Sequence, residues 1–185
     1  MAQGKTNING PHQGGWVDTN TGESWFVHFQ DKGAYGRVIH LNPMTWVNDW
    51  PVIGVDKDED GCGEPVTTYK KPNVGKTYPI ATPPESDEFN TRHLGLQWQW
   101  HANKKDTYGF TTDLGYIRLY AGSLSKEFVN FWEVPNLLMQ KFPAEEFTAT
   151  TKVTFTAKQD GEQTGIIVMG WDYSCLLYTS DAADE

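Results

Sequence analysis

The chain has 185 residues, of which 24 are acidic and 15 are basic, so its formal net charge is -9. This length suffices for one domain of ordinary size or for two partial ones. Phosphate binding needs clustered Lys and Arg, and no such cluster occurs, so the charge argues against a nucleic-acid partner and favours a neutral, polyhydroxylated ligand. No run of about 18 apolar residues occurs either, so we expect nothing in the chain to span a membrane.

Glycine, proline and aromatic residues are abundant, with 18 Gly, 10 Pro, 8 Trp, 8 Tyr and 9 Phe. Gly and Pro are common in turns, whereas aromatic side chains are enriched in strands. The composition therefore favours short strands joined by tight turns, and we expect an all-β fold.

The first 68 residues contain four runs that are typical of strands. These runs are Trp16–Asp18, Trp25–Phe29, Gly36–Leu41 and Trp46–Ile53. Asn20 and Gly22 separate the first two runs, which predicts a β-hairpin. Asn42-Pro43 is expected to interrupt the strand between the last two runs. Four short strands at spacings of about ten residues are what one blade of a β-propeller requires.

Residues 69–85 contain four prolines and no periodic apolar pattern, which is typical of an extended linker, and we place the domain boundary near Thr82. Strand-like alternation then recurs in Leu94–Trp100, Gly115–Tyr120, Phe147–Thr156 and Gly165–Trp171. Thr148–Phe155 is the clearest of these strands. The pattern predicts a β-sandwich over residues 86–174 that stops within a strand, and because an unfinished sheet exposes unpaired backbone we expect the natural domain to continue.

The last eleven residues, 175–185, have the sequence CLLYTSDAADE. This resembles the translated adapter that transposase-based DNA library preparation leaves at the ends of metagenomic reading frames. We expect the segment not to be native and leave it out of the predicted fold; the alternative is a natural disordered terminus. Cys62 is then the single native cysteine, and one cysteine forms no internal disulfide.

Three blocks of sequence together resemble glycoside hydrolase family 43, in the branch of β-xylosidases and α-L-arabinofuranosidases that carry a C-terminal concanavalin-like β-sandwich. The blocks are Asn9–Asp18 (NGPHQGGWVD), Tyr35–Trp46 (YGRVIHLNPMTW), and Asp87–Phe89 followed by Leu94–Trp100 (LGLQWQW). Any single block is weak, but the set is specific in order and spacing. The resemblance covers residues 1–174.

The resemblance implies a five-bladed β-propeller whose last blade is residues 1–68, a linker at 69–85, and the first part of the sandwich at 86–174, with four blades preceding Met1. Family members are O-glycosyl hydrolases that invert the anomeric carbon with an Asp base, a Glu acid and a second Asp that tunes the acid. We match none of these catalytic carboxylates in this chain, so we expect it to be inactive in isolation.

The same resemblance implies the substrate and the location of the parent enzyme. It implies release of xylose or arabinose from xylan, arabinoxylan or arabinan, with no required cofactor, in the periplasm or outside the cell. The polar residues after Met1 give no indication of export by themselves. The alternative function is a non-catalytic, carbohydrate-binding β-sandwich.

Two residues are the main candidates for substrate contact. His12 lies among small neighbours, and the resemblance implies that it points into the propeller channel and coordinates a cation or water, whereas the residue alone fits an exposed turn. Arg37 follows Gly36 at a strand start, and the resemblance implies that its planar fork reaches the bound pentose; the alternative is a solvent-facing Arg. Gln13 and Tyr35 are weaker supporting candidates.

Asp56, Asp58 and Asp60 alternate in one turn, the arrangement that wraps oxygen ligands around Ca²⁺. The bidentate Glu of a full calcium loop is missing, because Thr67 occupies its position, and Glu64 is a partial substitute. The alternative is a solvated acidic turn without metal. A bound Ca²⁺ would fix the loop and would not be catalytic.

Trp98 and Trp100 share one face of a predicted strand. That geometry suits a platform for a sugar ring or the inner face of a sandwich. Because large aromatic side chains are usually buried, packing is the favoured role. We expect the same of Trp16, Trp25, Trp46 and Trp50, which would pack between blades.

Overall fold

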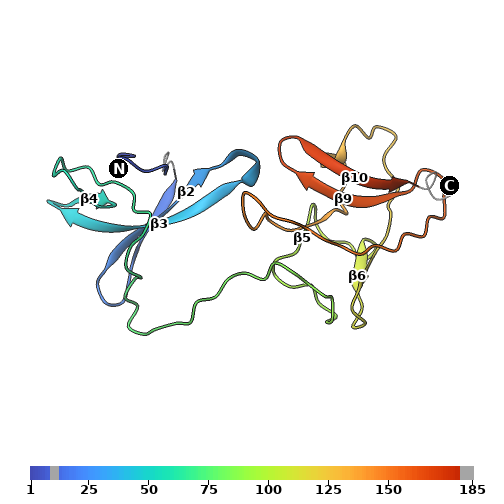
Figure 1. Cartoon of the computed structure of the whole chain (residues 1–185), viewed down its shortest axis with the longest axis horizontal. Helices are drawn as coiled ribbons and strands as arrows, with labels where there is room; N and C mark the ends of the chain where they lie inside the picture. Colours follow the sequence, from blue (N-terminus) through green and yellow to red (C-terminus); the bar gives the residue numbers. More distant parts are fainter. Residues whose placement is uncertain (9–12, 180–185) are drawn as a thin grey trace. The chain divides into compact units, whose positions relative to one another are not determined.

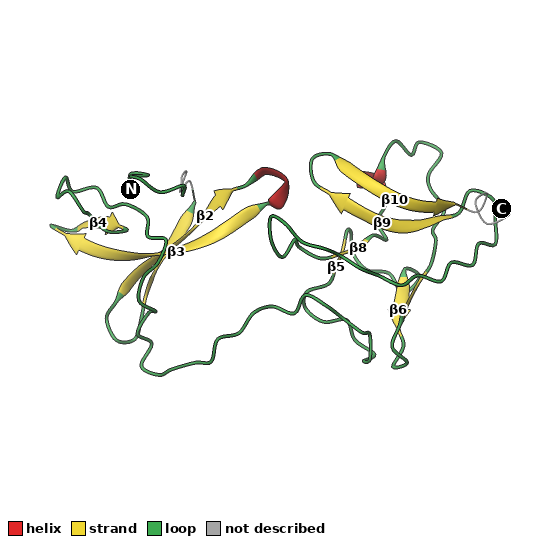
Figure 2. Ribbon diagram, viewed as in Figure 1, coloured by secondary structure: helices red, strands yellow, loops and turns green. Residues whose placement is uncertain are grey.

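A computed structural model describes all residues of the chain except 9–12 and 180–185. Within the described residues every regular element is a strand apart from two single-turn 3₁₀ helices, η1 (Gly33–Tyr35) and η2 (Phe131–Glu133), which confirms the predicted all-β fold (Figure 2). None of the described helices is long and apolar enough to cross a membrane. The chain divides into two compact units, Met1–Ile80 and Ala81–Glu185.

The first unit is one antiparallel sheet of four strands in chain order, the topology expected of a single blade (Figure 1). The strands are β1 (Gly14–Asp18), β2 (Ser24–Asp31), β3 (Arg37–Val47) and β4 (Trp50–Ile53). Tight turns join them. Gly22, in the β1–β2 turn, has a φ of 87°, and Asn48 and Asp49, between β3 and β4, have φ of 50° and 65°. Asn and Asp tolerate the left-handed backbone that a two-residue hairpin turn requires.

The expected break at Asn42-Pro43 is wrong, because β3 runs continuously through both residues. Pro43 lies one residue before Met44, the first residue of β3 that pairs with β4. There its carbonyl accepts a hydrogen bond from the Gly54 N–H at 2.7 Å. A proline at the end of a ladder removes no bond of that ladder, so the strand tolerates it.

The core of the first unit is small and partly polar. Trp25, Met44 and Ile8 are among its buried apolar side chains, with exposures of 3%, 4% and 5%. His28 and Asn42 are buried as deeply, at 2% and 0%. Since β2 and β3 pair with His28 opposite His40, the even-numbered side chains of both strands share one face of the sheet.

The second unit contains three separate two-stranded antiparallel sheets among its described residues. They pair β5 (Gln99–Trp100) with β8 (Leu138–Met139), β6 (Gly109–Thr111) with β7 (Ile117–Leu119), and β9 (Gln163–Met169) with β10 (Tyr173–Thr179). Tyr108 and Val134 are its most buried apolar side chains. The regions predicted as strands before Trp100, around Leu119 and before Trp171 each contain a strand, though shorter or shifted.

The clearest predicted strand, Thr148–Phe155, is wrong as a paired element, since the structure assigns no strand to it. Its residues alternate and are β-branched, which is the signal that predicted it. Strand formation also requires a neighbouring strand to take the backbone hydrogen bonds, and none of the described residues provides one here.

The segment left out of the predicted fold begins inside β10. Cys175 pairs with Ile167 and Thr179 with Gln163, so five residues of that segment continue the β9–β10 hairpin. The non-native origin of residues 175–185 stays a prediction, as do the domain limits at 68 and 85.

Candidate functional site

The sequence candidates for substrate contact gather at one end of the four-stranded sheet, as far as the structure describes them. Arg37 begins β3 and pairs with Asp31, the last residue of β2. Tyr35 ends η1, in the turn between these strands. Gln13 is exposed and immediately precedes Gly14, which pairs with His28 of β2. His12 lies outside the described residues.

Arg37 is held from two sides but faces solvent. Its guanidinium carbon lies 4.8 Å from the centre of the Phe29 ring, a cation–π contact, and its Nε lies 3.7 Å from Asp31 Oδ2. The side chain is nonetheless 65% exposed. An exposed ion pair of this kind contributes about 0–1 kcal/mol, so the guanidinium can exchange Asp31 for a sugar hydroxyl or a carboxylate at little cost.

The turn that carries Tyr35 is shaped by Asp31 and two glycines. Asp31 Oδ1 accepts a hydrogen bond from the Gly33 N–H at 2.8 Å. Gly33 and Gly36 have φ of 61° and 97°, in the left-handed region where a side chain would be strained. Asp31 therefore orders the turn with one carboxylate oxygen and faces Arg37 with the other.

A buried polar network on β2 and β3 was not predicted from the sequence. Asn42 Nδ2 lies 2.7 Å from His28 Nε2, and Asn42 Oδ1 accepts a hydrogen bond from the Val66 N–H at 2.8 Å. Because that oxygen is occupied, the amide of Asn42 donates to His28, and we assign the His28 proton to Nδ1. The signal was the placement of polar residues two apart, on the same strand face, in Phe26–Gln30.

The network continues to the N-terminal segment. His40 Nε2 lies 3.1 Å from Gln30 Oε1, and Gln30 Nε2 donates to the Asn7 carbonyl at 2.8 Å. The rings of His28 and His40 stack with centroids 5.4 Å apart. Burial lowers the pKa of His40 below its ordinary value, with smaller contributions from nearby His28 and Lys32. Burial therefore disfavours the charged form of His40, and the hydrogen bonds suit the network to structural support.

The predicted calcium loop brings its three carboxylates together. One oxygen from each of Asp56, Asp58 and Asp60 lies within 4.8 Å of the others. Asp56 Oδ2 accepts a hydrogen bond from the Gly61 N–H, whereas Asp56 Oδ1 is buried without a hydrogen-bond partner among the described residues. Glu64 is engaged elsewhere, since Lys57 Nζ lies 3.2 Å from its Oε2. The oxygen set suits a hard cation, and Ca²⁺ stays a prediction.

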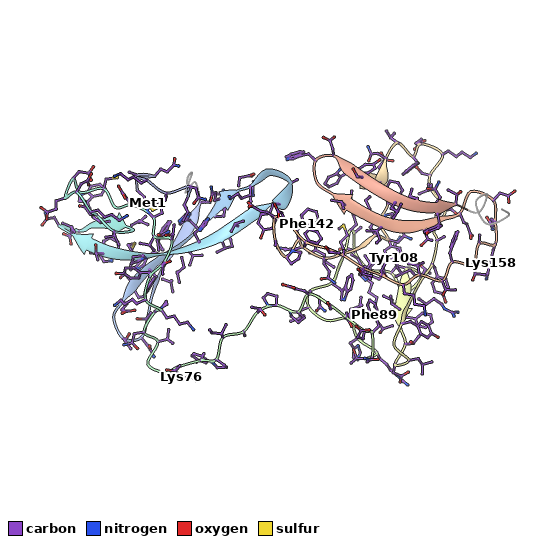
Figure 3. All side chains as sticks on the ribbon, viewed as in Figure 1. Met1, Lys76, Phe89, Tyr108, Phe142 and Lys158 are labelled. Carbon is purple, nitrogen blue, oxygen red and sulfur yellow. The ribbon has the colours of Figure 1, made fainter. Side chains whose placement is uncertain are left out.

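The tryptophans singled out in the sequence make contacts within their own unit but differ in burial. Trp98 donates from Nε1 to Asp87 Oδ2 at 2.8 Å and lies against Phe89, and Trp100 lies against Tyr108; Phe89 and Tyr108 are labelled in Figure 3. Trp16 and Trp46 meet edge to face at 5.0 Å. Both remain exposed, at 55% and 46%, and Trp50 is 76% exposed, so of the four tryptophans expected to pack in the first unit only Trp25, at 3%, is buried.

Comparison with known proteins identifies the family of the second part of the chain and finds relatives that match most of its length. The family model of the β-xylosidase C-terminal concanavalin A-like domain matches residues 86–184. A protein of Xylanibacter ruminicola assigned as a β-xylosidase is 45% identical over 157 residues, or 83% of this chain and 29% of that protein. A non-reducing end α-L-arabinofuranosidase of Bacteroides ovatus is 30% identical over 166 residues, or 84% of this chain and 29% of that enzyme.

A solved structure supports the same fold. The crystal structure of a GH43 protein from Bacillus licheniformis aligns with 96% of this chain and 35% of its own, with a TM-score of 0.62 and 23% sequence identity. At that identity the likeness shows the fold alone. The chain spans less than a third of the length of the two relatives named above. By the match of residues 86–184, which confirms the resemblance found in the sequence, the chain belongs to glycoside hydrolase family 43, in the group with a C-terminal concanavalin A-like domain.

Proposed function

We propose that this chain is part of a glycoside hydrolase that releases xylose or arabinose from xylan, arabinoxylan or arabinan. The observation that carries the proposal is the order of its parts: a four-stranded, blade-like sheet precedes a region that matches the sandwich domain of β-xylosidases. The relatives are named for release of these two pentoses. The first unit would be the last blade of a five-bladed propeller.

In this proposal the chain supplies the edge of the sugar pocket and not the catalytic carboxylates. Arg37, Tyr35 and Gln13 lie at one sheet end, and Arg37 has an exposed guanidinium that suits sugar hydroxyls. We propose that His12 joins them. The Asp base, Glu acid and tuning Asp would come from the preceding blades, so the isolated chain would bind substrate weakly and would not hydrolyse it.

The amount of exposed surface supports a chain that packs against further β-structure. The accessible surface is 14487 Å². Two separate folded units of half this mass would together expose roughly 11,000 Å². The excess includes large apolar side chains in both units, such as Trp50 at 76% and Trp171 at 89%. Neighbouring blades and the remaining sandwich strands would cover such side chains.

The alternative, a carbohydrate-binding module without catalysis, has less support. It would use Trp98 and Trp100 as a platform, but their contacts with Asp87, Phe89 and Tyr108 leave both half-buried. Affinity electrophoresis in gels containing xylan or arabinan separates the two functions. Strong retardation of the isolated chain would favour the binding module, whereas unchanged mobility favours the enzyme part.

The gene itself provides the experiment that tests the enzyme proposal. We expect the contiguous DNA before Met1 to encode four further blades that carry an Asp, a second Asp and a Glu in that order. In the complete protein, Arg37→Ala should raise KM for aryl xylosides or arabinofuranosides by about tenfold, the loss expected for a charged hydrogen bond to substrate. An unrelated gene directly before Met1 would contradict the proposal.

Two further features belong to the same proposal. The acidic loop Asp56–Asp60 would hold a structural Ca²⁺. The enzyme would act in the periplasm or outside the cell, where polymeric xylan and arabinan are met.

A further inference from the structure

A segment of the predicted linker is fastened to the first unit. This segment, Tyr69–Gly75, is called the strap below; it lies against the turn between β1 and β2. One side chain of that turn, Glu23, makes three contacts with hydrogen-bonding distances. Its Oε1 accepts from Lys70 Nζ at 2.9 Å, and its Oε2 accepts from the Asn73 N–H at 2.8 Å and from Trp25 Nε1 at 3.2 Å. The contacts with Lys70 and Asn73 join residues 47 and 50 positions apart in the sequence.

A second residue of the turn holds the same part of the strap. The Thr21 hydroxyl donates to the Asn73 carbonyl at 2.5 Å, so both backbone groups of Asn73 are bound by this one turn. The turn is ordered from within, because the Glu23 N–H donates to Thr19 Oγ1 at 3.0 Å and the hydroxyls of Thr19 and Thr21 lie 3.0 Å apart. The anchoring groups are therefore in place without the strap.

The strap also makes apolar contacts beside its hydrogen bonds with Glu23 and Thr21. The ring of Tyr69 meets Trp25 edge-on with centroids 5.8 Å apart. Pro72 and Val74 line a shallow cavity of about 410 Å³ together with side chains of the sheet that include Trp25 and Leu41. Trp25 is only 3% exposed, although Leu41 on the same sheet is 41% exposed. The strap thus lies over the deepest aromatic residue of the first unit.

We propose that Glu23 is a latch that fixes the strap to the turn between β1 and β2, so that the part of the predicted linker that opens readily begins after Gly75 and not at Tyr69. The rest of the predicted linker, residues 76–85, is called the tether below; we expect it to be open to proteases whether the latch is closed or not.

Trypsin provides a direct test on the 185-residue chain, because the strap and the tether each contain a cleavable lysine. The Lys70–Lys71 bond lies inside the strap, whereas the Lys76–Thr77 bond lies just beyond it; Lys76 is labelled in Figure 3. Since Lys71 precedes Pro72, only the bond after Lys70 reports on the strap. We expect native chain to be cut at Lys76–Thr77 first, with Lys70–Lys71 protected.

The variants Glu23→Ala and Thr21→Val should open the strap. Loss of a hydrogen bond to a charged group should raise the rate at Lys70–Lys71, relative to Lys76–Thr77, by about tenfold or more in Glu23→Ala and by less in Thr21→Val. Glu85→Ala is the matched control, since it removes an exposed carboxylate outside the strap and should leave the ratio unchanged. Mass spectrometry of early fragments gives both rates.

Selective opening at Lys70–Lys71 supports the latch. If the rate of cleavage at Lys70–Lys71 relative to Lys76–Thr77 is the same in the native chain, Glu23→Ala and Thr21→Val, the proposal is overturned. If Glu23→Ala instead opens sites throughout the first unit, such as Lys32 and Lys57, that variant reports unfolding. The milder Thr21→Val then decides, and a ratio in Thr21→Val equal to that of the native chain would count against the latch.

Discussion

At the scale of single residues, Asn42 is the fully buried polar side chain whose hydrogen bonds matter most to the first unit. Its side chain is fully buried and serves both His28 Nε2 and the Val66 N–H. The first contact joins two strands, and the second fastens the chain that follows β4. A buried polar group is stable only while its partners are present, so this network specifies one arrangement of the sheet.

Replacement of Asn42 should therefore be costly. Asn42→Ala leaves two buried polar groups without partners, and we expect a loss of about 2–4 kcal/mol in the free energy of unfolding. Urea unfolding followed by tryptophan fluorescence measures it. Asn103→Ala, at an exposed position, is the control and should change stability by less than about 0.5 kcal/mol. Equal midpoints for the two variants would show that the network is unimportant.

Glu23 makes stability depend on pH in a defined direction. The Asn73 N–H, and after it Lys70, lower the pKa of Glu23 below its ordinary value of 4.5. A carboxyl with a lower pKa in the folded state stabilises the fold above pH 4.5, and this contribution is lost as the pH falls through the folded pKa. The melting temperature of the native chain should thus exceed that of Glu23→Gln at pH 7, and the difference should shrink on acidification. A difference that grows below pH 4 would contradict the assignment.

At the scale of elements, turn chemistry and alternation predicted the first unit well. Asn20, Gly22 and the aromatic runs gave four strands in chain order, because each strand finds its partner in the next one along the chain. Pro43 misled the prediction, since a sequence does not show whether a proline falls inside a ladder or at its end. Thr148–Phe155 misled it for the opposite reason: its pattern is clear, but pairing depends on a neighbour that local sequence does not provide.

The candidate site could be predicted only in part. The positions of Arg37 and Tyr35 at a strand start followed from the Gly36 turn. Their meeting with Gln13 at one sheet end depends on strand register, which pairs Gly14 with His28 and Asp31 with Arg37. The strap was predicted as part of an extended linker because Pro72 and the two lysines before it give no sign of the distant Glu23 that binds this segment.

The acidic loop after β4 carries a prediction of its own. If Asp56, Asp58 and Asp60 bind Ca²⁺, the ion should raise the melting temperature and EDTA should reverse the rise, because a ligand bound only to the folded state stabilises it. Asp58→Asn should remove most of the effect, whereas Glu85→Gln, outside the loop, should keep it. Equal melting curves with calcium and with EDTA would favour the solvated acidic turn.

At the scale of the whole molecule, the two units differ in how far their strands are joined into one sheet. The first has one continuous four-stranded sheet, whereas the described part of the second has three separate two-stranded sheets. Two-stranded sheets are marginal alone. We expect the second unit to exchange its backbone amides faster than the first, measurable by hydrogen exchange and mass spectrometry. Uniform protection of both units would contradict this expectation.

The central claim is that this chain is one portion of a pentose-releasing glycosidase. It is tested most directly by the rate of p-nitrophenol release from aryl β-xyloside and aryl α-L-arabinofuranoside, measured for the complete gene product and for the 185-residue chain. We predict release from at least one substrate by the complete protein and none by the chain alone. A complete protein that is folded but inactive on both substrates, or an active isolated chain, would contradict the account.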